Sequence, residues 1–294
     1  GDVFIAAGVE HMSLGPWVIS KASKPFGNDS QMHDSSFGWR FINPKMEELY
    51  GTDAMGQTAE NLIDIHKISR EDQDAFAYRS QTKAAEATES GRLAKEIVPV
   101  RIPQRKKDDI VFERDEFIKA NTTPEILAKL RPAFRKDGSV TAGNSSGLND
   151  GAAATLVASG KAIKDHNFKP LARIVSSGVV GVEPRIMGIG PVDASKLALK
   201  RAGLNLADMD VIELNEAFAA QSLAVMRSLG LDDDDPRVNP NGGAVAIGHP
   251  LGMTGTRITY SAALELKLTG KKYALCTMCI GVGQGYAVIL ENAS

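Results

Sequence analysis

The chain has 294 residues, of which 43% are hydrophobic and 24% charged, and its formal net charge is −2 at pH 7. This composition is ordinary for a globular protein with a sizeable core in two or more lobes. It excludes a basic nucleic-acid or anionic-membrane binder, and no apolar run is long enough to span a bilayer. Two cysteines are too few for a disulfide scaffold, which indicates a reducing, cytoplasmic setting.

The sequence begins at Gly1, and the apolar run of residues 3–7 predicts a buried strand. Its start lacks the basic residues and cleavage site of a signal peptide. Because a buried strand opens the chain, we expect the chain to be a fragment. We also expect exposed apolar surface around residues 3–7 and 152–158, and aggregation when the chain is expressed alone.

A long loop and two helices are predicted next. Residues 10–56 are rich in glycine, proline, serine and aromatic residues and show no clean hydrophobic period, which is typical of a partly structured loop region. One predicted helix begins with Thr58 as its N-cap. The next has Ser69 as its N-cap and ends at Gly91.

The remaining elements alternate between strands and helices. Residues 93–103 predict a strand, residues 104–116 are charged and exposed, and Thr123 begins a short helix. Further strands are predicted at 152–158, 171–180, 211–214, 273–278 and 286–291, and further helices at 193–203, 216–230 and 254–270. This alternation indicates an α/β fold, and the short glycine-rich joint predicts that the last two strands are antiparallel.

The only two cysteines, Cys276 and Cys279, are spaced C-x-x-C in "CTMCIGVGQG". A redox pair usually lies at a helix N-terminus and a structural zinc site needs four ligands, so neither pattern fits well. Both residues could be core, or Cys279 could point into a site while Cys276 projects from the opposite face of the strand. The glycines that follow suit either a tight hairpin or a loop whose N–H groups stabilise an oxyanion.

Two polar motifs lie at loop-to-helix junctions. His249 stands between glycine and proline just before a helix, which constrains its position and suits a general base or an oxyanion donor better than a solvated side chain. Asn215 could be a helix N-cap, but the end of a strand is also the usual ligand crevice of an α/β sheet. Residues 141–153 are either a linker or a loop that wraps a ligand.

Four motifs occur in order: "GNSSGLNDGAA", "LNEAFAAQ", "NPNGGAVAIGHPLGMTG" and "CTMCIGVGQG". Together they resemble the thiolase family, which makes or cleaves 3-oxoacyl-CoA by thiolysis or Claisen condensation through a cysteine acyl-enzyme. The stretches "GWRFINPKMEELYG" and "ALCTMCIGVGQG" are most similar to thiolases that act on 3-oxoadipyl-CoA in aromatic degradation. Fatty acid degradation is the other pathway class that the resemblance implies.

The resemblance implies the thiolase fold, with two βαβαβαββ halves in five layers (αβαβα) and a loop domain inserted in the first half. Residues 1–19 and 149–168 would be the truncated first half, 20–148 the loop domain, and 169–294 the second half. The implied partners are CoA esters and further copies of the chain in a homodimer or homotetramer. No metal or other cofactor is implied.

The resemblance also implies roles for individual residues. His249 would deprotonate the nucleophilic thiol, and Cys279 would be the acid/base at the α-carbon. Asn215 would hold a water that, with His249, stabilises the enolate oxygen. The N–H of Gly281 would belong to a second oxyanion hole. The implied binding residues are Ser146, Ala142 and Phe134 along the pantetheine, Lys119 at the CoA phosphates, and Met55 and Phe218 at the acyl group.

The sequence departs from the family pattern at the nucleophile. The resemblance implies a further cysteine, at a helix start before the first strand, that these 294 residues do not contain. We therefore expect an enzyme as the full-length protein and no activity from this chain alone. The alternative is a non-catalytic remnant that only binds CoA esters. Ala54 also replaces a histidine of some thiolases, which leaves the acyl preference open.

Overall fold

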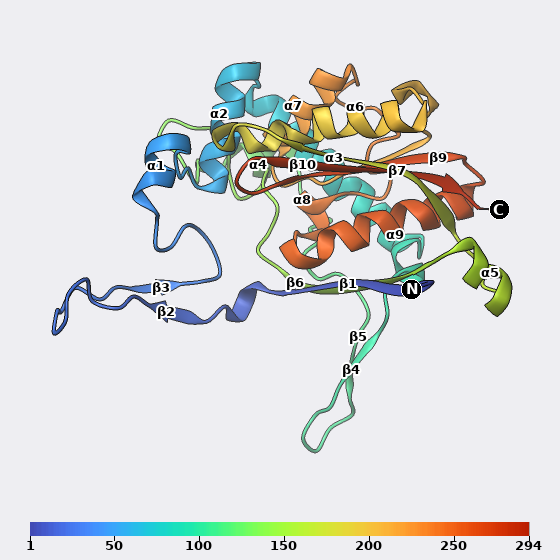
Figure 1. Ribbon diagram of the computed structural model, residues 1–294, viewed down its shortest axis with the longest axis horizontal. Coiled ribbons are helices and arrows are strands. Elements are labelled where there is room, and N and C mark those ends of the chain that lie inside the picture. The colour runs from blue at the N-terminus through green and yellow to red at the C-terminus, as the bar shows by residue number, and fades with distance from the viewer. Residues whose placement is uncertain (294) are drawn as a thin grey trace.

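The structure is a computed structural model, and it describes residues 1–293. Its body is layered (Figure 1): two helices lie on one face of a four-stranded sheet, a long helix lies on the other, and a two-stranded sheet lies beyond that helix. From the helical side inward, these elements are α6 (Gly190–Ala202) and α7 (Ala219–Leu229), then the four-stranded sheet, α9 (Leu251–Thr269), and the pair β1 (Val3–His11) and β6 (Asp150–Ala158).

The four-stranded sheet has the order β7–β10–β9–β8. Its strands are β7 (Ala172–Gly181), β8 (Val211–Leu214), β9 (Tyr273–Ile280) and β10 (Gln284–Asn292). β9 and β10 form the expected antiparallel hairpin, while β8 runs parallel to β9. Parallel pairing requires a crossover, which α7, α8 (Ala244–Ile247) and α9 provide between β8 and β9.

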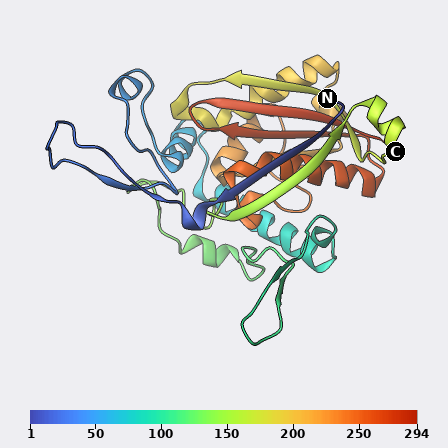
Figure 2. The same cartoon turned by 60° about the horizontal axis from the view of Figure 1, so that its bottom comes forward.

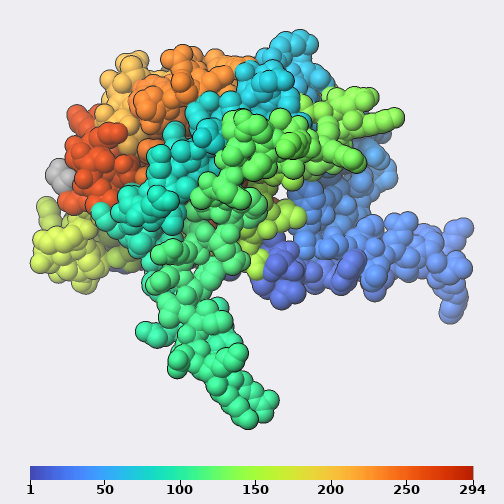
Figure 3. Space-filling model, turned by 180° about the vertical axis from the view of Figure 1, so that it is seen from behind, coloured from blue at the N-terminus to red at the C-terminus, as the bar shows by residue number. Residues whose placement is uncertain are grey.

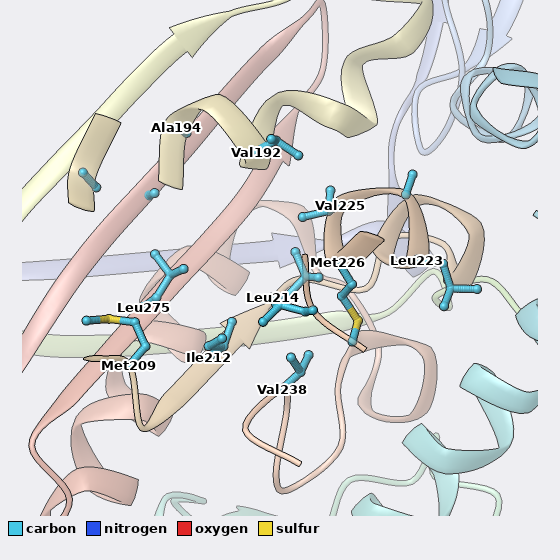
Figure 4. Close-up of a cluster of buried hydrophobic side chains, with 14 of the residues drawn as sticks. Val192, Ala194, Met209, Ile212, Leu214, Leu223, Val225, Met226, Val238 and Leu275 are labelled. Atoms are coloured by element: carbon cyan, nitrogen blue, oxygen red, sulfur yellow. The ribbon is translucent and has the colours of Figure 1, made fainter. Parts of the chain in front are cut away.

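Apolar side chains fill both faces of this sheet. Figure 4 shows part of the larger cluster, where Leu223 and Met226 of α7 lie above Ile212 and Leu214 of β8. The smaller cluster lies between the sheet and α9 and includes Cys276. Both sides of β8 are therefore buried, and even its one charged residue, Glu213, is only 2% exposed.

β1 and β6 are antiparallel along their whole length and cross the front of the molecule side by side (Figure 2). The prediction that residues 3–7 are buried is wrong for this structure. Ile5 is 74% exposed and Phe4 57%, because this sheet has only two strands and α9 covers only part of it. Leu156 on β6 is exposed as well, so the apolar surface that we expected at both segments is present. The domain boundaries given above stay a prediction.

Two hairpin arms leave the body in different directions (Figure 3). The first is β2 (Trp17–Ile19) with β3 (Met32–Asp34), in the region predicted to be a loop. The second is β4 (Val100–Ile102) with β5 (Ile110–Phe112), so the strand predicted over 93–103 is shorter and follows a 3₁₀ turn at Leu93–Lys95. Further 3₁₀ turns lie at Met12–Leu14, Pro184–Ile189 and Leu206–Asp208.

The remaining helices are α1 (Pro44–Tyr50), α2 (Met55–His66), α3 (Arg70–Glu89), α4 (Pro124–Ala128) and α5 (Gly160–His166). The caps Ser69 and Thr123 are confirmed, since each side chain accepts a hydrogen bond from the first helical turn. Thr58 is not an N-cap: α2 starts at Met55, and the Thr58 hydroxyl donates to the Met55 carbonyl. None of the helices in residues 1–293 combines the length and apolar character of a bilayer span.

Candidate active site

One large cavity brings together residues from both ends of the chain. It encloses about 1090 Å³ and lies where β9 ends, beside the starts of α2, α7 and α9. Its walls include His249, Cys279 and Gly281 from the C-terminal motifs and Met55, Phe134, Ser146 and Phe218 from the segments expected to hold substrate. The strand end and the loop before α9 thus meet at a crevice typical of α/β sheets.

Asn215 follows β8 and is 1% exposed. Its backbone N–H donates to the Thr277 carbonyl at 3.0 Å, which extends the parallel pairing with β9 by one residue. Its side chain reaches His249, with 3.3 Å between Nδ2 and Nε2, and its Oδ1 is buried without a partner. Asn215 is not an N-cap, because α7 begins four residues later with Phe218 in the capping position.

The ring of His249 is oriented from its other nitrogen. Nδ1 lies 2.8 Å from the hydroxyl oxygen of Thr254, and that hydroxyl lies 2.9 Å from the Pro250 carbonyl. A hydroxyl has one proton and Thr254 donates it to the carbonyl, so its oxygen must accept from Nδ1–H. This network assigns the neutral ring the Nδ1–H tautomer and leaves the Nε2 lone pair toward Asn215.

The environment of His249 keeps the ring neutral. The side chain is buried in the cavity wall, and burial, with a smaller contribution from the Arg257 charge, lowers its pKa to about 4. At neutral pH the ring can therefore accept a proton at Nε2. The sequence did not indicate Thr254 as a partner; its place four residues after Pro250, in the first turn of the next helix, was the only available signal.

The two cysteines lie on opposite sides of β9. Cys276 is packed in the cluster against α9, whereas Cys279 lines the cavity and is 4% exposed. Both are free thiols, so the C-x-x-C spacing does not form a disulfide here. Burial raises the pKa of Cys279 to about 12, which keeps it a protonated thiol that can donate a proton.

The glycine-rich stretch after Cys279 is the tight turn of the β9–β10 hairpin. Val282 and Gly283 both have positive φ, at 68° and 88°. A side chain on Gly283 would collide with the Val182 carbonyl, whereas one on Gly281 would meet nothing within 4 Å. The hairpin interpretation is therefore confirmed, and the predicted oxyanion role of Gly281 stays a prediction.

A buried glutamate connects the loops of the site. Glu216 is 2% exposed and accepts hydrogen bonds from Ser80 of α3, from Asn239 and from the Val245 backbone. Burial raises its pKa, and the bonds from Ser80 and Asn239 oppose that shift. The segments carrying Asn215 and His249 are thus tied to α3 through one carboxyl group.

The predicted substrate residues separate into two groups. Phe134 and Phe218 meet edge to face in the cavity wall, 5.8 Å between ring centroids. Ser146 is held there because its N–H donates to the Ala217 carbonyl at 3.0 Å. Ala142 and Lys119 do not line the cavity; both are exposed, and the Lys119 ammonium lies 4.1 Å over the ring of Phe117.

The structure adds lining residues that the motifs did not single out. Gln221 of α7 is 1% exposed, lines the cavity, and has both side-chain polar atoms without a partner. Arg40 lines the cavity from the segment between the first arm and α1. Residues 1–293 contain no group of three or more His, Cys, Asp or Glu side chains placed to hold a metal ion.

Comparison with known proteins agrees with this geometry. The family "Thiolase, N-terminal domain" matches residues 1–161, and "Thiolase, C-terminal domain" matches residues 168–292. The chain is 56% identical over 290 residues to a "Beta-ketoadipyl-CoA thiolase" of Acinetobacter baylyi, and this match covers 99% of the chain and 72% of the relative. It is 55% identical over 292 residues to the Escherichia coli "3-oxoadipyl-CoA/3-oxo-5,6-dehydrosuberyl-CoA thiolase", covering 99% of the chain and 73% of that protein.

Solved structures show the same fold. The crystal structure of human mitochondrial 3-ketoacyl-CoA thiolase aligns with a TM-score of 0.91 at 46% identity, covering 99% of this chain and 72% of that one. The Bacillus anthracis acetyl-CoA acetyltransferase aligns with a TM-score of 0.89 at 44% identity, with the same coverage.

Proposed function

Because this chain belongs to the thiolase family, we propose that it functions as an acyl-CoA:acetyl-CoA C-acyltransferase with 3-oxoadipyl-CoA as its substrate. The relatives at 52–56% identity are named beta-ketoadipyl-CoA thiolases, which supports this substrate. One structural observation carries the proposal: a neutral histidine base and a protonated buried thiol, His249 and Cys279, line one cavity. The alternative of a non-catalytic CoA-ester binder has no support among these relatives.

The chemistry divides between the two residues. Attack of a thiolate on the 3-keto carbon breaks the bond between C2 and C3, and the electron pair moves into an acetyl-CoA enolate. The thiol of Cys279 protonates C2 of that enolate to give acetyl-CoA. His249 accepts the proton of the attacking thiol at Nε2, and the charge that develops on the thioester oxygen needs fixed donors in the same cavity.

The donors for the oxyanion are proposed from the same geometry. Asn215 has its Oδ1 buried without a protein partner, which fits a residue that holds a water beside His249. Gly281 follows Cys279 by two residues and lines the cavity, which supports its backbone N–H as a donor of the second hole. Losing one such donor typically costs roughly 3–4 kcal/mol of transition-state stabilisation.

We further propose that CoA and its esters are substrates and that no other cofactor takes part. The steps are addition of a thiolate to a carbonyl, cleavage of C2–C3 to an enolate, protonation of that enolate and transfer of the acyl group to CoA, and thiols, imidazole and oxyanion donors suffice for each of them. We also propose a cytoplasmic homodimer or homotetramer. Two free buried cysteines fit a reducing compartment, and the exposed apolar residues of β1 and β6 fit contacts between copies.

Exchange of the α-protons of acetyl-CoA in D₂O tests the proposal. The acyl-accepting cysteine that the family resemblance implies is neither Cys276 nor Cys279, so the absence of activity expected from these 294 residues alone concerns acyl transfer. Exchange of the α-protons is a partial reaction that needs only the residues described here. We expect the chain to exchange these protons faster than buffer does, as followed by proton NMR, and the variant Cys279→Ala to lose this activity. Equal exchange with and without the protein would refute the proposed chemistry.

A further inference from the structure

The acyl group of the proposed substrate carries a charge of its own. Cleavage of 3-oxoadipyl-CoA at C2–C3 leaves a succinyl group, whose free carboxylate lies three carbons beyond the reacting carbonyl. The cavity wall is mostly apolar, with Met55, Leu62, Phe134 and Phe218 among its lining residues. A carboxylate placed there without a partner would be strongly disfavoured, so its recognition needs a cation with hydrogen-bond donors.

Arg40 is the only arginine or lysine among the described residues that line this cavity. None of the ion pairs within residues 1–293 includes its guanidinium, and its one side-chain hydrogen bond goes to the Gly38 carbonyl. Hydrogen bonds from Ser36 lower the pKa of the exposed Asp34, and the Arg40 charge adds only a smaller contribution. A guanidinium has five N–H donors, so two parallel N–H groups are still available to donate to the two oxygens of a carboxylate.

The one carboxyl side chain in the described cavity wall already has a hydrogen-bond donor. Glu10 accepts from the Gly252 N–H at 3.1 Å, at the start of α9. None of the ion pairs within residues 1–293 joins Glu10 to Arg40. The described cavity wall therefore contains one acid, which is bound at the start of α9, and one arginine without an ion-pair partner, which favours an anionic group beside Arg40.

The segment that carries Arg40 is anchored against the start of α2. The indole N–H of Trp39 donates to the Asp53 carbonyl at 3.1 Å, two residues before Met55. Lys119, expected at the CoA phosphates, lies outside the described cavity wall, and its neighbour Phe117 packs at Gly147. Arg40 thus borders the side of the cavity that Met55 lines, where the acyl group is expected.

We infer that Arg40 is a specificity-determining residue that binds the terminal carboxylate of a dicarboxylic acyl-CoA. This inference rests on the proposed function, because it assigns the acyl end of the same site. The Arg40 guanidinium donates two hydrogen bonds to the carboxylate and contributes nothing to the binding of free CoA. A neutral acyl group of equal shape gains no such contact.

Calorimetric titration of the whole chain tests the inference with three probes: succinyl-CoA, the similarly shaped neutral 4-methylpentanoyl-CoA, and free CoA. We expect the wild type to bind succinyl-CoA more tightly than the neutral ester. Arg40→Gln should lower the affinity for succinyl-CoA by roughly 10- to 100-fold, the range of a charged hydrogen bond. The affinities of the other two probes should change less than about twofold. Arg40→Lys keeps the positive charge but loses the paired N–H groups of the guanidinium, so its affinity for succinyl-CoA should lie between those of the wild type and Arg40→Gln.

The control is Lys45→Gln, which removes an exposed cation outside the cavity, and melting curves verify that each variant is folded. If Arg40→Gln lowered the affinities of all three probes equally, Arg40 would contact the CoA moiety and the inference would be wrong. It would also be wrong if the wild type bound the neutral ester as well as succinyl-CoA and still exchanged α-protons. A wild type that bound none of the probes would instead overturn the proposed function, and the inference with it.

Discussion

Asn215 and His249 are 34 residues apart in the sequence, yet Nδ2 of one lies 3.3 Å from Nε2 of the other. This contact depends on the tautomer of the His249 ring. On the opposite side of the ring Thr254 accepts from Nδ1–H, so Nε2 carries no proton. The amide proton of Asn215 therefore meets a lone pair and not a second N–H. The first turn of α9 therefore determines which nitrogen of His249 is available for chemistry.

Removing the Thr254 hydroxyl should disturb the tautomer and orientation of the His249 ring. In Thr254→Val the buried Nδ1–H loses its acceptor, which costs about 1–3 kcal/mol. We expect α-proton exchange to fall roughly 5- to 150-fold, since every 1.4 kcal/mol is a factor of ten. Thr254→Ser keeps the hydroxyl and should retain most of the rate. Nitrogen NMR of the His249 ring would contradict the assignment if the Nδ1–H tautomer persisted in the valine variant.

The two cysteines should respond differently to replacement by alanine. Cys279→Ala removes the proton donor and acceptor at the α-carbon, and exchange should fall by about 10²–10⁴-fold. Cys276→Ala removes only packing in the α9 cluster and should cost on the order of 1 kcal/mol of unfolding free energy. α-Proton exchange and urea denaturation, measured on both variants, test these two expectations. Loss of exchange in the Cys276 variant alone would reverse the assignment.

The exchange rate should rise with pH. Taking an α-proton requires the thiolate of Cys279, whose pKa burial raises to about 12, so the thiolate fraction increases about tenfold per pH unit below that value. His249 is already neutral above its pKa of about 4 and adds no further step near neutrality. A plateau between pH 7 and 9 in the rate profile would show that another group is the base.

His249 should also contribute to acid denaturation. Its pKa is lowered to about 4 from an ordinary value of 6.5, so between these values the unfolded chain binds more protons than the folded one. Stability therefore falls as pH decreases from 6.5 to 4, by on the order of 3 kcal/mol for the full shift. His249→Gln should remove this part of the pH dependence, measured as urea unfolding at pH 7 and pH 4.5. An unchanged difference between the two pH values would contradict the burial argument.

The turn glycines of the β9–β10 hairpin provide a matched pair. Gly283 has a φ of 88°, and an added side chain would collide with the Val182 carbonyl, so Gly283→Ala should cost about 1–3 kcal/mol or more. Gly281→Ala meets open space and should leave the unfolding free energy almost unchanged. Because the Gly281 variant keeps its backbone N–H, it should also keep most of its exchange activity. Equal destabilisation of both variants would be inconsistent with the described turn.

The sequence by itself predicted the elements whose signals are local. Ser69 and Thr123 cap their helices because a side-chain oxygen needs only the next turn. The β9–β10 hairpin follows from strand residues on both sides of a glycine turn. The ordered motifs also singled out His249 and Cys279, which lie in distinctive local patterns and line one cavity, while their catalytic roles stay a prediction.

Only the tertiary structure decided the features that depend on distant segments. Residues 215–218 are not helical because Phe218 pairs with Ser145 and the Ala219 N–H donates to the Asn144 carbonyl, contacts that no local pattern encodes. Arg40 lies in a stretch without hydrophobic period, and it reaches the cavity of His249 only through the packing of its segment against α2. The physical reason is the same in both cases: hydrogen bonds and charges between residues far apart in the chain act only after the fold has brought them together.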